Sequence, residues 1–506
     1  MSSADGVTPD AAPPSVARSI GWLSLAKLVA QIASWAATLL VMRILDPRDY
    51  GIVGLAAAIF TLVFSFAEFG LSKAITQEKR IDSKLLGEAS GLGLLIAAVA
   101  AVVWIAIAEG LVVVYEQPLL RPIALVQIAA LLFGALTVVP TSLVEREFRF
   151  KAMAICEVGV TLIAITVSLT GALLGWGLWV LAIGHSVNTG ARAILYNIAT
   201  RGQPRPRWPR SQRVRRFLEF GFSVAPSRLM YNLENSIDVV IGGRFLSPAG
   251  LGFYNVAVYW SHVPLGKMMV VLNQALYPFF AAKARGEQTM VRETENLVRM
   301  VAMLALPVFW GLSAVAESLV FGLLGEKWAG VLLPLHVLCL VIPLRMVLES
   351  VTNPLQAARG LRVMLKNHVG SLATVATGCL IGVGYGATGL ALGVAGGIMV
   401  GNLLALNRSL RWLGCNRWSL LVSMWRLALA AALMAVTVYA GGQWLDAIGV
   451  PRVLTLFCQI PLGGLIYIPL VLLLERPLAM QVIGALRPGA APAPAAPPAP
   501  AEEPVP

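Results

Sequence analysis

The chain is 506 residues long, and 58% of its residues are hydrophobic whereas only 13% are charged. A soluble domain carries about 25% charged residues, so this composition excludes a set of soluble domains and predicts a polytopic membrane protein. The mean hydropathy of +0.76 agrees. In such a chain the net charge of +13 indicates basic cytoplasmic loops rather than a nucleic-acid partner.

Fourteen apolar segments have the length of membrane-spanning helices, near the ~20 residues that cross a ~30 Å hydrocarbon core. They lack the strict alternation of barrel strands. The predicted fold class is therefore an all-α membrane protein with 14 transmembrane helices. The predicted spans are 20–42, 51–76, 87–114, 122–144, 152–174, 177–199, 217–241, 251–280, 298–322, 331–353, 367–386, 388–407, 419–441 and 453–474.

The basic residues divide unevenly among the connections between these spans. With a cytoplasmic N-terminus, 27 Lys and Arg residues lie on the cytoplasmic side, six on the outer side and six inside spans. Because basic loops stay in the cytoplasm, both termini are predicted there. Residues 1–17 lack the features of a signal peptide and, like the Ala/Pro-rich tail 481–506, are predicted to be disordered.

The sequence repeats itself with an offset of 201 residues. Four residues recur at equal spacings on the predicted outer side: Arg43, Leu45, Pro47 and Gly51 are matched by Arg244, Leu246, Pro248 and Gly252. Each copy contains six spans, an even number, so the copies run parallel and are related by an axis near the membrane normal. The predicted organisation is an N-lobe at 18–199, a basic loop at 200–216, a C-lobe at 217–410 and two appended helices at 411–480.

Two lobes related by a pseudo-two-fold axis are typical of an alternating-access transporter. The connections are too short to hold a soluble catalytic domain, and no phosphate loop or zinc-protease motif occurs. The sequence GxGxxG at 384–389 lies between two apolar segments and predicts a tight hairpin rather than a dinucleotide site. We therefore expect a protein that is not an enzyme and uses no cofactor or metal.

The same offset pairs polar residues within the spans, because Lys27 falls on Arg228 and Gln31 falls on Asn232. Polar residues recur at steps of three and four and form one stripe on each helix: Ser24, Lys27, Gln31, Ser34 and Thr38 in the first span, and Arg228, Asn232, Asn235 and Asp238 in the seventh. A charge facing lipid at the helix centre costs roughly 2.5–3.5 kcal/mol, so these faces must turn towards protein or a watery cavity. Two cations at an inter-lobe cavity would suit an anion such as a diphosphate. The alternative is that both cations extend towards the cytoplasmic interface, or that Arg228 neutralises a nearby carboxylate.

The candidate substrate-binding residues share a polar or cationic side chain inside a span; they are Lys27, Gln31, Arg228, Asn232, Asn235, Lys267 and Arg192. A structural ion pair is the alternative for Lys267 and Arg192. The candidates for ion coupling are intramembrane carboxylates, namely Asp238, Glu234, Glu68 and Glu157. Glu88 is a further candidate proton carrier, and hydration at the interface is the alternative for Glu68, Glu88 and Glu157. Arg345 is expected to neutralise Glu349 four residues later.

Several short motifs carry a resemblance to a known family: Arg43–Gly51, Phe69–Ser72, Leu143–Phe150, Gly175–Trp179 and Gly325–Trp328. Over about residues 18–480 the chain resembles Wzx-type polysaccharide flippases, particularly the WzxC-like branch of the multidrug/oligosaccharidyl-lipid/polysaccharide exporter superfamily. The motifs are mostly structural turns, so they indicate the family and not its cargo.

This resemblance implies a flippase of the bacterial inner membrane. Its substrate would be an oligosaccharide repeat unit linked to undecaprenyl diphosphate, moved for exopolysaccharide or lipopolysaccharide biosynthesis through a cationic central cavity. The implied partners are that lipid carrier, membrane lipids, a polysaccharide polymerase and the export machinery. Two alternatives remain: a drug or cation exporter of the same superfamily, which would have an acidic cavity, and a membrane polymerase or glycosyltransferase, which would need a long outer loop.

Overall fold

The chain folds into long α-helices joined by short connections, as a computed structural model shows. The structure describes residues 14–68, 71–78, 80–202, 205–285, 290–415, 417–478 and 480, and no strand occurs among them. The predicted all-α fold class is confirmed. Of the two predicted tails, residues 1–13 and 481–506 lie outside the described residues, while α1 already begins at Pro14.

Helices lie over every predicted span, in some as one helix and in others as two or three consecutive helical elements. The first half of the chain contains α1 (Pro14–Ile44), α2 (Pro47–Glu68), α3 (Leu71–Gln77), α4 (Ser83–Tyr115), α5 (Leu120–Arg146), α6 (Phe150–Leu173) and α7 (Trp179–Ala199). The second half contains α8 (Gln212–Glu234), α9 (Ile237–Phe245), α10 (Pro248–Arg285), α11 (Val291–Ala314), α12 (Ala316–Leu319), η1 (Val320–Leu324), η2 (Glu326–Val331), α13 (Leu332–Ala357), α14 (Leu361–Gly382), η3 (Val383–Tyr385), α15 (Gly386–Trp412), α16 (Arg417–Ala447) and α17 (Arg452–Leu474).

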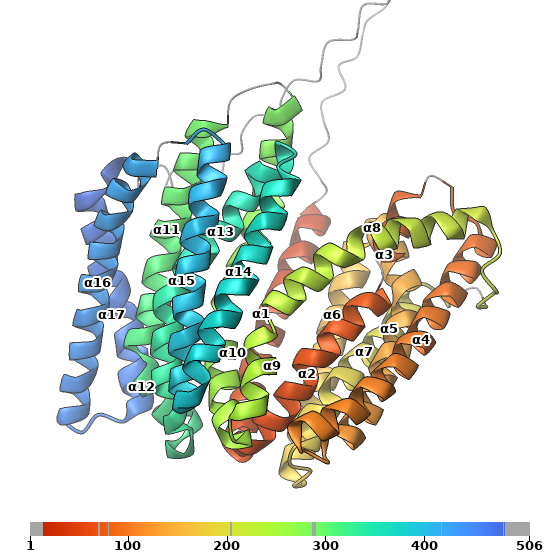
Figure 1. Ribbon diagram of the computed structural model, residues 1–506, viewed down its shortest axis with the longest axis horizontal. Helices are drawn as coiled ribbons and strands as arrows, with labels where there is room; N and C mark the ends of the chain where they lie inside the picture. Colours follow the sequence, from red (N-terminus) through yellow and green to blue (C-terminus); the bar gives the residue numbers. More distant parts are fainter. Residues whose placement is uncertain are drawn as a thin grey trace, which may run out of the picture.

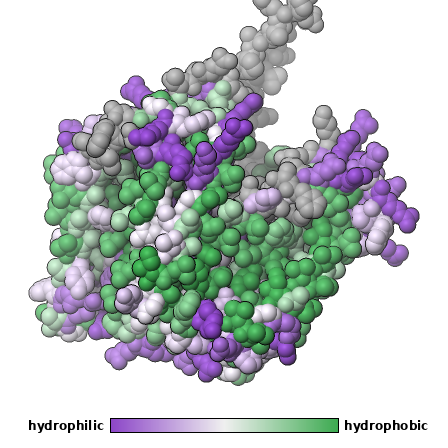
Figure 2. All heavy atoms as spheres, viewed as in Figure 1, coloured by the Kyte–Doolittle hydropathy of each residue, from purple (hydrophilic) through white to green (hydrophobic). Residues whose placement is uncertain are grey.

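The surface of the molecule has the polarity that a bilayer requires. Ten described segments are long and apolar enough to cross a membrane, and one of them, Leu361–Trp412, contains both α14 and α15. Figure 2 shows hydrophobic side chains over the middle of the visible face and hydrophilic ones at its upper and lower ends. The multi-pass membrane architecture is thereby confirmed, whereas the count of fourteen spans and their orientation stay predictions.

One predicted span, 217–241, is not a single helix, because a two-residue turn separates α8 from α9. The side-chain Nδ2 of Asn235 donates to the carbonyl oxygen of Tyr231 at 2.6 Å. Such a bond gives the backbone an alternative to the helical ladder. The helix then restarts with Asp238 in the first turn of α9, where a carboxylate is favourable. The prediction of one continuous helix here was wrong.

The helices gather into two bundles, which correspond to the predicted lobes. In Figure 1, α2–α7 (red to yellow) form one bundle, and α9–α17 (green to blue) form the other. Helix α1 packs along α6 and also contacts η1 of the second bundle, while α16 and α17 pack beside α11. We call the bundles the N-lobe and the C-lobe; their boundaries in the sequence stay a prediction.

The two copies of the repeated motif meet each other where α2 and α10 begin. A Cβ atom on Gly51 would lie 1.8 Å from the carbonyl oxygen of Pro248, and one on Gly252 would lie 1.7 Å from that of Pro47. Only glycine allows the two backbones to approach so closely. Because equivalent residues of the two repeats touch, the pseudo-two-fold axis passes beside this contact.

Further contacts close this end of the molecule, which is the predicted outer end. The Lys327 ammonium lies 3.4 Å from the Asp46 carboxylate. Next to it, the indole nitrogen of Trp328 donates to the carbonyl oxygen of Met42 at 2.9 Å. These bonds join the C-lobe to the last turn of α1 and to the connection that follows it, so the lobes are held together at this end.

Helix α8 connects the lobes and crosses the space between them in Figure 1. Near its start, Val214 and Phe217 pack in a hydrophobic cluster with Leu71 of the N-lobe. At its end, the Glu234 carboxylate lies 2.8 Å from Nδ1 of His368 on α14 of the C-lobe. Phe217, which was predicted to open the C-lobe, therefore packs in the N-lobe.

The segment with the GxGxxG sequence forms a tight hairpin between α14 and α15, as predicted. A short 3-10 turn, η3, joins the two helices. A Cβ atom on Gly378 would lie 2.0 Å from the carbonyl oxygen of Gly393, so the two helix backbones are in direct contact. Of the glycines in the motif itself, Gly389 packs in the same way, since a Cβ atom on it would lie 2.4 Å from the carbonyl oxygen of Gly382, and Gly386 has the positive φ of a turn. The dinucleotide interpretation is excluded.

Candidate functional site

Two adjoining chambers lie inside the N-lobe and at its border with the C-lobe. The α5–α7 chamber, of about 430 Å³, is lined by residues of α5 and α7 together with residues of α2 and α3. The inter-lobe chamber, of about 610 Å³, lies between α1, α2, α6, α7 and α10. Both are lined by His185 and Asn188, so they are neighbours. Their volumes fall in the range of small-molecule sites.

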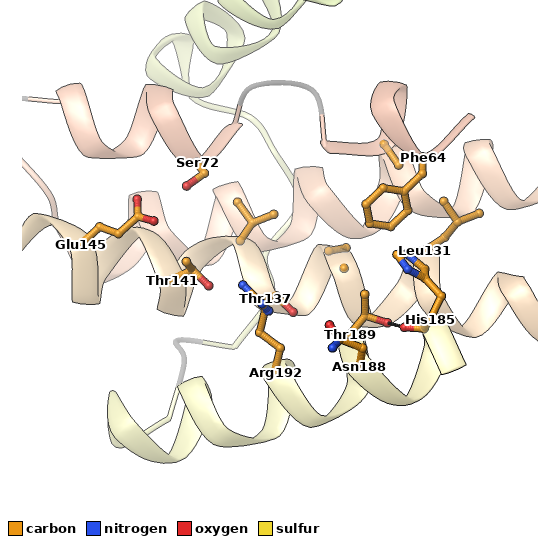
Figure 3. A pocket seen from close by; sticks show the side chains of 14 residues that line it. Phe64, Ser72, Leu131, Thr137, Thr141, Glu145, His185, Asn188, Thr189 and Arg192 are labelled. Atoms are coloured by element: carbon orange, nitrogen blue, oxygen red, sulfur yellow. Dashed lines mark hydrogen bonds between the residues drawn. The ribbon is translucent and has the colours of Figure 1, made fainter. Parts of the chain in front are cut away.

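The lining of the α5–α7 chamber is rich in hydroxyl and amide groups, as Figure 3 shows. Its polar side chains are Ser72, Thr137, Thr141, Glu145, His185, Asn188, Thr189 and Arg192, and Phe64 and Leu131 supply apolar surface. In Figure 3 the side chains of α5 face those of α7 across the chamber. Sequence reasoning identified only Arg192 among these residues.

A local signal for this chamber was nevertheless present in the sequence. His185, Asn188, Thr189 and Arg192 follow one another at steps of three, one and three, which places all four on one face of α7. A polar face on a membrane helix must turn away from lipid. The stripe on α7 could have been recognised in the same way as the stripes of the first and seventh predicted spans.

The Arg192 guanidinium both lines the α5–α7 chamber and takes part in an ion pair. Its Nη2 atom lies 2.9 Å from Oε2 of Glu157, and the Tyr196 hydroxyl donates to the other carboxylate oxygen at 2.7 Å. The ion-pair alternative for Arg192 is therefore confirmed, and Glu157 is the residue that neutralises it. The role of either residue in binding or ion coupling stays a prediction.

Two predicted substrate-binding residues from different lobes are in direct contact. The Lys267 ammonium on α10 donates to Oε1 of Gln31 on α1 at 2.9 Å. The Lys27 side chain, one helical turn from Gln31, is exposed. Farther along the same helix, Ser34 and Thr38 line the inter-lobe chamber. The predicted polar stripe of α1 thus ends at a cavity.

Two other candidate residues cannot be placed beside these. Arg228 lies on α8 and Glu68 at the end of α2, but both side chains lie outside the described residues. Asn232, which the repeat pairs with Gln31, donates its amide to the Ser65 hydroxyl of α2 and so helps to hold α8 against the N-lobe.

The remaining candidates are Glu234, Asn235 and Asp238. They belong to a packed polar network in the C-lobe and line neither chamber. The buried Asp238 carboxylate accepts a hydrogen bond from the Tyr254 hydroxyl at 2.5 Å. The Arg345 guanidinium contacts the Asn235 side chain and lies 3.2 Å from the Glu349 carboxylate, so the predicted neutralisation of Arg345 by Glu349 is confirmed.

The space inside this network is small. The cavity that Glu234, Asn235 and Asp238 help to line has a volume of about 20 Å³, which is room for one water molecule. An oligosaccharide or a diphosphate does not fit there. Asn235 therefore lies apart from the chambers, while the ion-coupling roles of Glu234 and Asp238 stay predictions.

Glu88 differs from the expectation of a hydrated carboxylate at the interface. The residue is only 3% exposed. Its Oε2 atom accepts a hydrogen bond from the backbone N–H of Ser211 at 3.2 Å, just before α8 begins. The carboxylate thus fixes the end of the basic inter-lobe loop, and the expectation of hydration was wrong for this residue.

Comparison with known proteins places the chain among membrane proteins of polysaccharide biosynthesis. The profile of a family described as "Polysaccharide biosynthesis protein" matches residues 40–333. The chain is 24% identical over 355 residues to the lipopolysaccharide biosynthesis protein WzxC of Escherichia coli (strain K12), covering 69% of this chain and 71% of that protein. It is 22% identical over 351 residues to an uncharacterized membrane protein in the cps region of Klebsiella pneumoniae, covering 67% and 70%.

The fold is also similar to that of solved structures. The structure described as "Lipid II flippase MurJ, inward closed conformation" matches with a TM-score of 0.72, covering 90% of this chain and 99% of that chain. The sequence identity is 14%, so this likeness concerns the fold alone.

Proposed function

The chain belongs to the family of polysaccharide biosynthesis proteins, and from this premise we propose that it is a flippase for oligosaccharide repeat units linked to undecaprenyl diphosphate. It would act in the bacterial inner membrane, with both termini in the cytoplasm, and would be a transporter rather than an enzyme. The observation that carries the proposal is the pair of polar chambers beside the border of the two lobes, in a fold similar to that of a lipid II flippase.

The arrangement of the lobes suggests how such a transporter moves. The described contacts at the predicted outer end centre on Gly51 and Gly252, where the repeat axis passes. Rocking of the lobes that releases this contact and brings their cytoplasmic ends together would close the cytoplasmic side and open the outer side, which is the usual movement of transporters built from two repeats. The structure would then correspond to a state that receives substrate from the cytoplasmic leaflet.

The cations on α1 and α10 are the groups best suited to the diphosphate. Lys267 contacts Gln31 across the lobe border at 2.9 Å, and Lys27 follows the same face of α1. Charge-assisted hydrogen bonds from two ammonium groups would hold a diphosphate between the lobes. A ligand that contacts both lobes can favour one arrangement of them over another. Contacts with membrane lipids, a polymerase and export machinery are part of the same proposal.

Two experiments test the proposal. Deletion of the protein tests the flippase function, and substitution of Lys27 and Lys267 tests whether these lysines bind the diphosphate. A strain that lacks the protein should lose its surface polysaccharide and accumulate lipid-linked repeat units on the inner leaflet. The variant with both Lys27→Ala and Lys267→Ala should restore less than about a tenth of the polysaccharide, since two charge-assisted hydrogen bonds contribute roughly 1.5–3 kcal/mol each. The variant Lys84→Ala, at the exposed start of α4, should restore it fully.

The amount of each variant in the membrane is measured as well, so that a loss of polysaccharide can be distinguished from a loss of the protein. Normal polysaccharide in the deletion strain would contradict the flippase proposal. Full activity of the double variant would leave the flippase proposal intact and refute the assignment of the two lysines.

A further inference from the structure

We propose that the α5–α7 chamber binds a neutral sugar ring of the repeat unit, while the diphosphate stays outside it, beside Lys267. The inference rests on the proposed function and specifies which part of the substrate each region holds. It follows from three properties of the chamber: the direction of its hydroxyl groups, its charge, and its connection to the lobe border.

The hydroxyl groups of the chamber are arranged to accept hydrogen bonds. Thr137 donates its hydroxyl proton to the carbonyl oxygen of Phe133 at 2.8 Å, and Thr189 donates to that of His185 at 2.9 Å. Each proton is used within its own helix, so the lone pairs of the oxygen remain for a donor in the chamber. Sugars present many hydroxyl donors, whereas an ionised diphosphate has only acceptors. The hydroxyl oxygens of Thr137 and Thr189 are therefore suited to accept hydrogen bonds from the hydroxyl groups of a sugar.

One hydroxyl group in the lining has no partner of its own. The Oγ1 atom of Thr141 is buried and makes no hydrogen bond with the described residues, and Thr141 faces the same chamber (Figure 3). A buried hydroxyl without a partner costs free energy that a bound ligand can recover. The ring of Phe64 at the chamber wall offers an apolar face for the C–H side of a sugar ring.

The charge of the chamber argues against an anion. Besides His185, the lining contains one basic side chain, Arg192, and one acidic side chain, Glu145. Arg192 is already neutralised by Glu157 at 2.9 Å. Two carboxylates thus accompany one guanidinium. A diphosphate or a uronic acid would meet no excess positive charge here, and its own charge would be repelled by Glu145.

The chamber is connected to the place where the diphosphate would lie. It shares His185 and Asn188 with the inter-lobe chamber, whose wall includes Ser34 of α1. Ser34 lies one helical turn from Gln31, the partner of Lys267. A repeat unit could therefore extend from the diphosphate through the inter-lobe chamber, with a sugar ring in the α5–α7 chamber.

Binding of two matched probes to the full chain in lipid nanodiscs tests the inference. One probe is a polyprenyl diphosphate that carries a neutral hexose, and the other is the same polyprenyl diphosphate without sugar. The variant Thr141→Val keeps the shape of the side chain and removes its hydroxyl. It should weaken binding of the hexose probe by about three- to tenfold, the effect of one hydrogen bond, and leave binding of the bare probe unchanged.

A matched control and a stability measurement accompany this variant. Thr377→Val removes a hydroxyl from the exposed face of α14, where it bonds only to its own helix, and should change neither affinity. Without ligand, Thr141→Val should unfold at the same temperature as the original protein or a higher one, because a buried hydroxyl without a partner is removed. Weaker hexose binding by a stable variant then reflects the chamber and not misfolding.

The other outcomes separate the two proposals. If Thr141→Val binds both probes as the original protein does, the sugar chamber is refuted and the flippase proposal stands. If a probe carrying a uronic acid binds as tightly as the hexose probe, the selectivity for neutral sugars is refuted. If the original protein binds neither probe, the proposed function itself fails.

Discussion

At the scale of single residues, the ion pair with Glu157 limits the positive charge that Arg192 can offer to a ligand. Its guanidinium lines a chamber, yet the Glu157 carboxylate holds it at 2.9 Å and the Tyr196 hydroxyl holds Glu157 in turn. An arginine held in this way has a fixed direction and little free charge. The residue therefore shapes the chamber wall more than it attracts anions, which is a different role from the cationic one expected from the sequence.

We expect Glu157→Gln to destabilise the protein and to make the chamber more positive. Because both side chains are about one third exposed, the pair contributes only about 0.5–1.5 kcal/mol. Thermal unfolding in detergent should show a loss of this size. The double variant Glu157→Gln/Arg192→Gln should recover part of it, and Tyr196→Phe, which keeps the ion pair, should lose less. Equal stability of all variants would show that the pair contributes nothing.

At the scale of elements, the basic loop before α8 is attached to α4 and is not a free linker. We call its residues 205–210 the strap. The backbone N–H of Arg207 donates to the carbonyl oxygen of Gly87 at 2.8 Å. Glu88 binds Ser211 at the end of the loop, and the Arg213 guanidinium lies 3.2 Å from the Asp82 carboxylate. The strap attaches the start of α8 to α4, so α8 is anchored to the N-lobe before it crosses to the C-lobe.

The variant Gly91→Ala should detach this strap. A Cβ atom on Gly91 would lie 1.9 Å from the carbonyl oxygen of Arg207, a backbone atom that cannot give way without moving the loop. Trypsin should then cleave after Arg207 and Arg210 of the strap several times faster, since proteolysis follows local opening. Gly110→Ala in the same helix meets no atom within 4 Å and should leave the cleavage rate unchanged. An unchanged rate in Gly91→Ala would show that the strap is not fixed.

At the scale of the whole molecule, the contact between α2 and α10 sets how the lobes are arranged. Gly51 and Gly252 bring the two backbones together on the repeat axis, and Lys327 reaches Asp46 beside them. Because these contacts join the two lobes at the predicted outer end, that end can open only when they are released.

Gly51→Ala should push the lobes apart at this end and favour the outward-open arrangement. The added Cβ atom would lie 1.8 Å from a backbone oxygen, so the helices must separate. Distances between spin labels on the two lobes, placed on a cysteine-free background, should lengthen at the outer end. Gly464→Ala on α17, which meets nothing within 4 Å, serves as the control. Unchanged distances in Gly51→Ala would show that this contact does not hold the outer end closed.

Breaking the ion pair between Lys327 and Asp46 should also favour separation of the lobes at the outer end, but less strongly than Gly51→Ala does. Lys327→Ala removes the bond to Asp46, and both partners are partly exposed, so the expected shift is about 0.2–1 kcal/mol. The shift should shrink as salt rises, because exposed charges are screened. The label distances of Lys327→Ala at low and high salt measure this, and a shift that is independent of salt would contradict the electrostatic cause.

The sequence by itself determined the all-α class, the membrane class, the repeat and the hairpin between α14 and α15, because hydropathy and glycine spacing act over short stretches of chain. It did not show the break between α8 and α9. It also determined the pair Arg345–Glu349, whose members are four residues apart on one helix. Only the tertiary structure decided that Lys267 meets Gln31, 236 residues away, that Glu157 neutralises Arg192, and that Asn235 lies in a closed network. These pairings depend on how separate helices pack and rotate against one another, and the periodicity of a single helix shows which face is polar but not what that face meets.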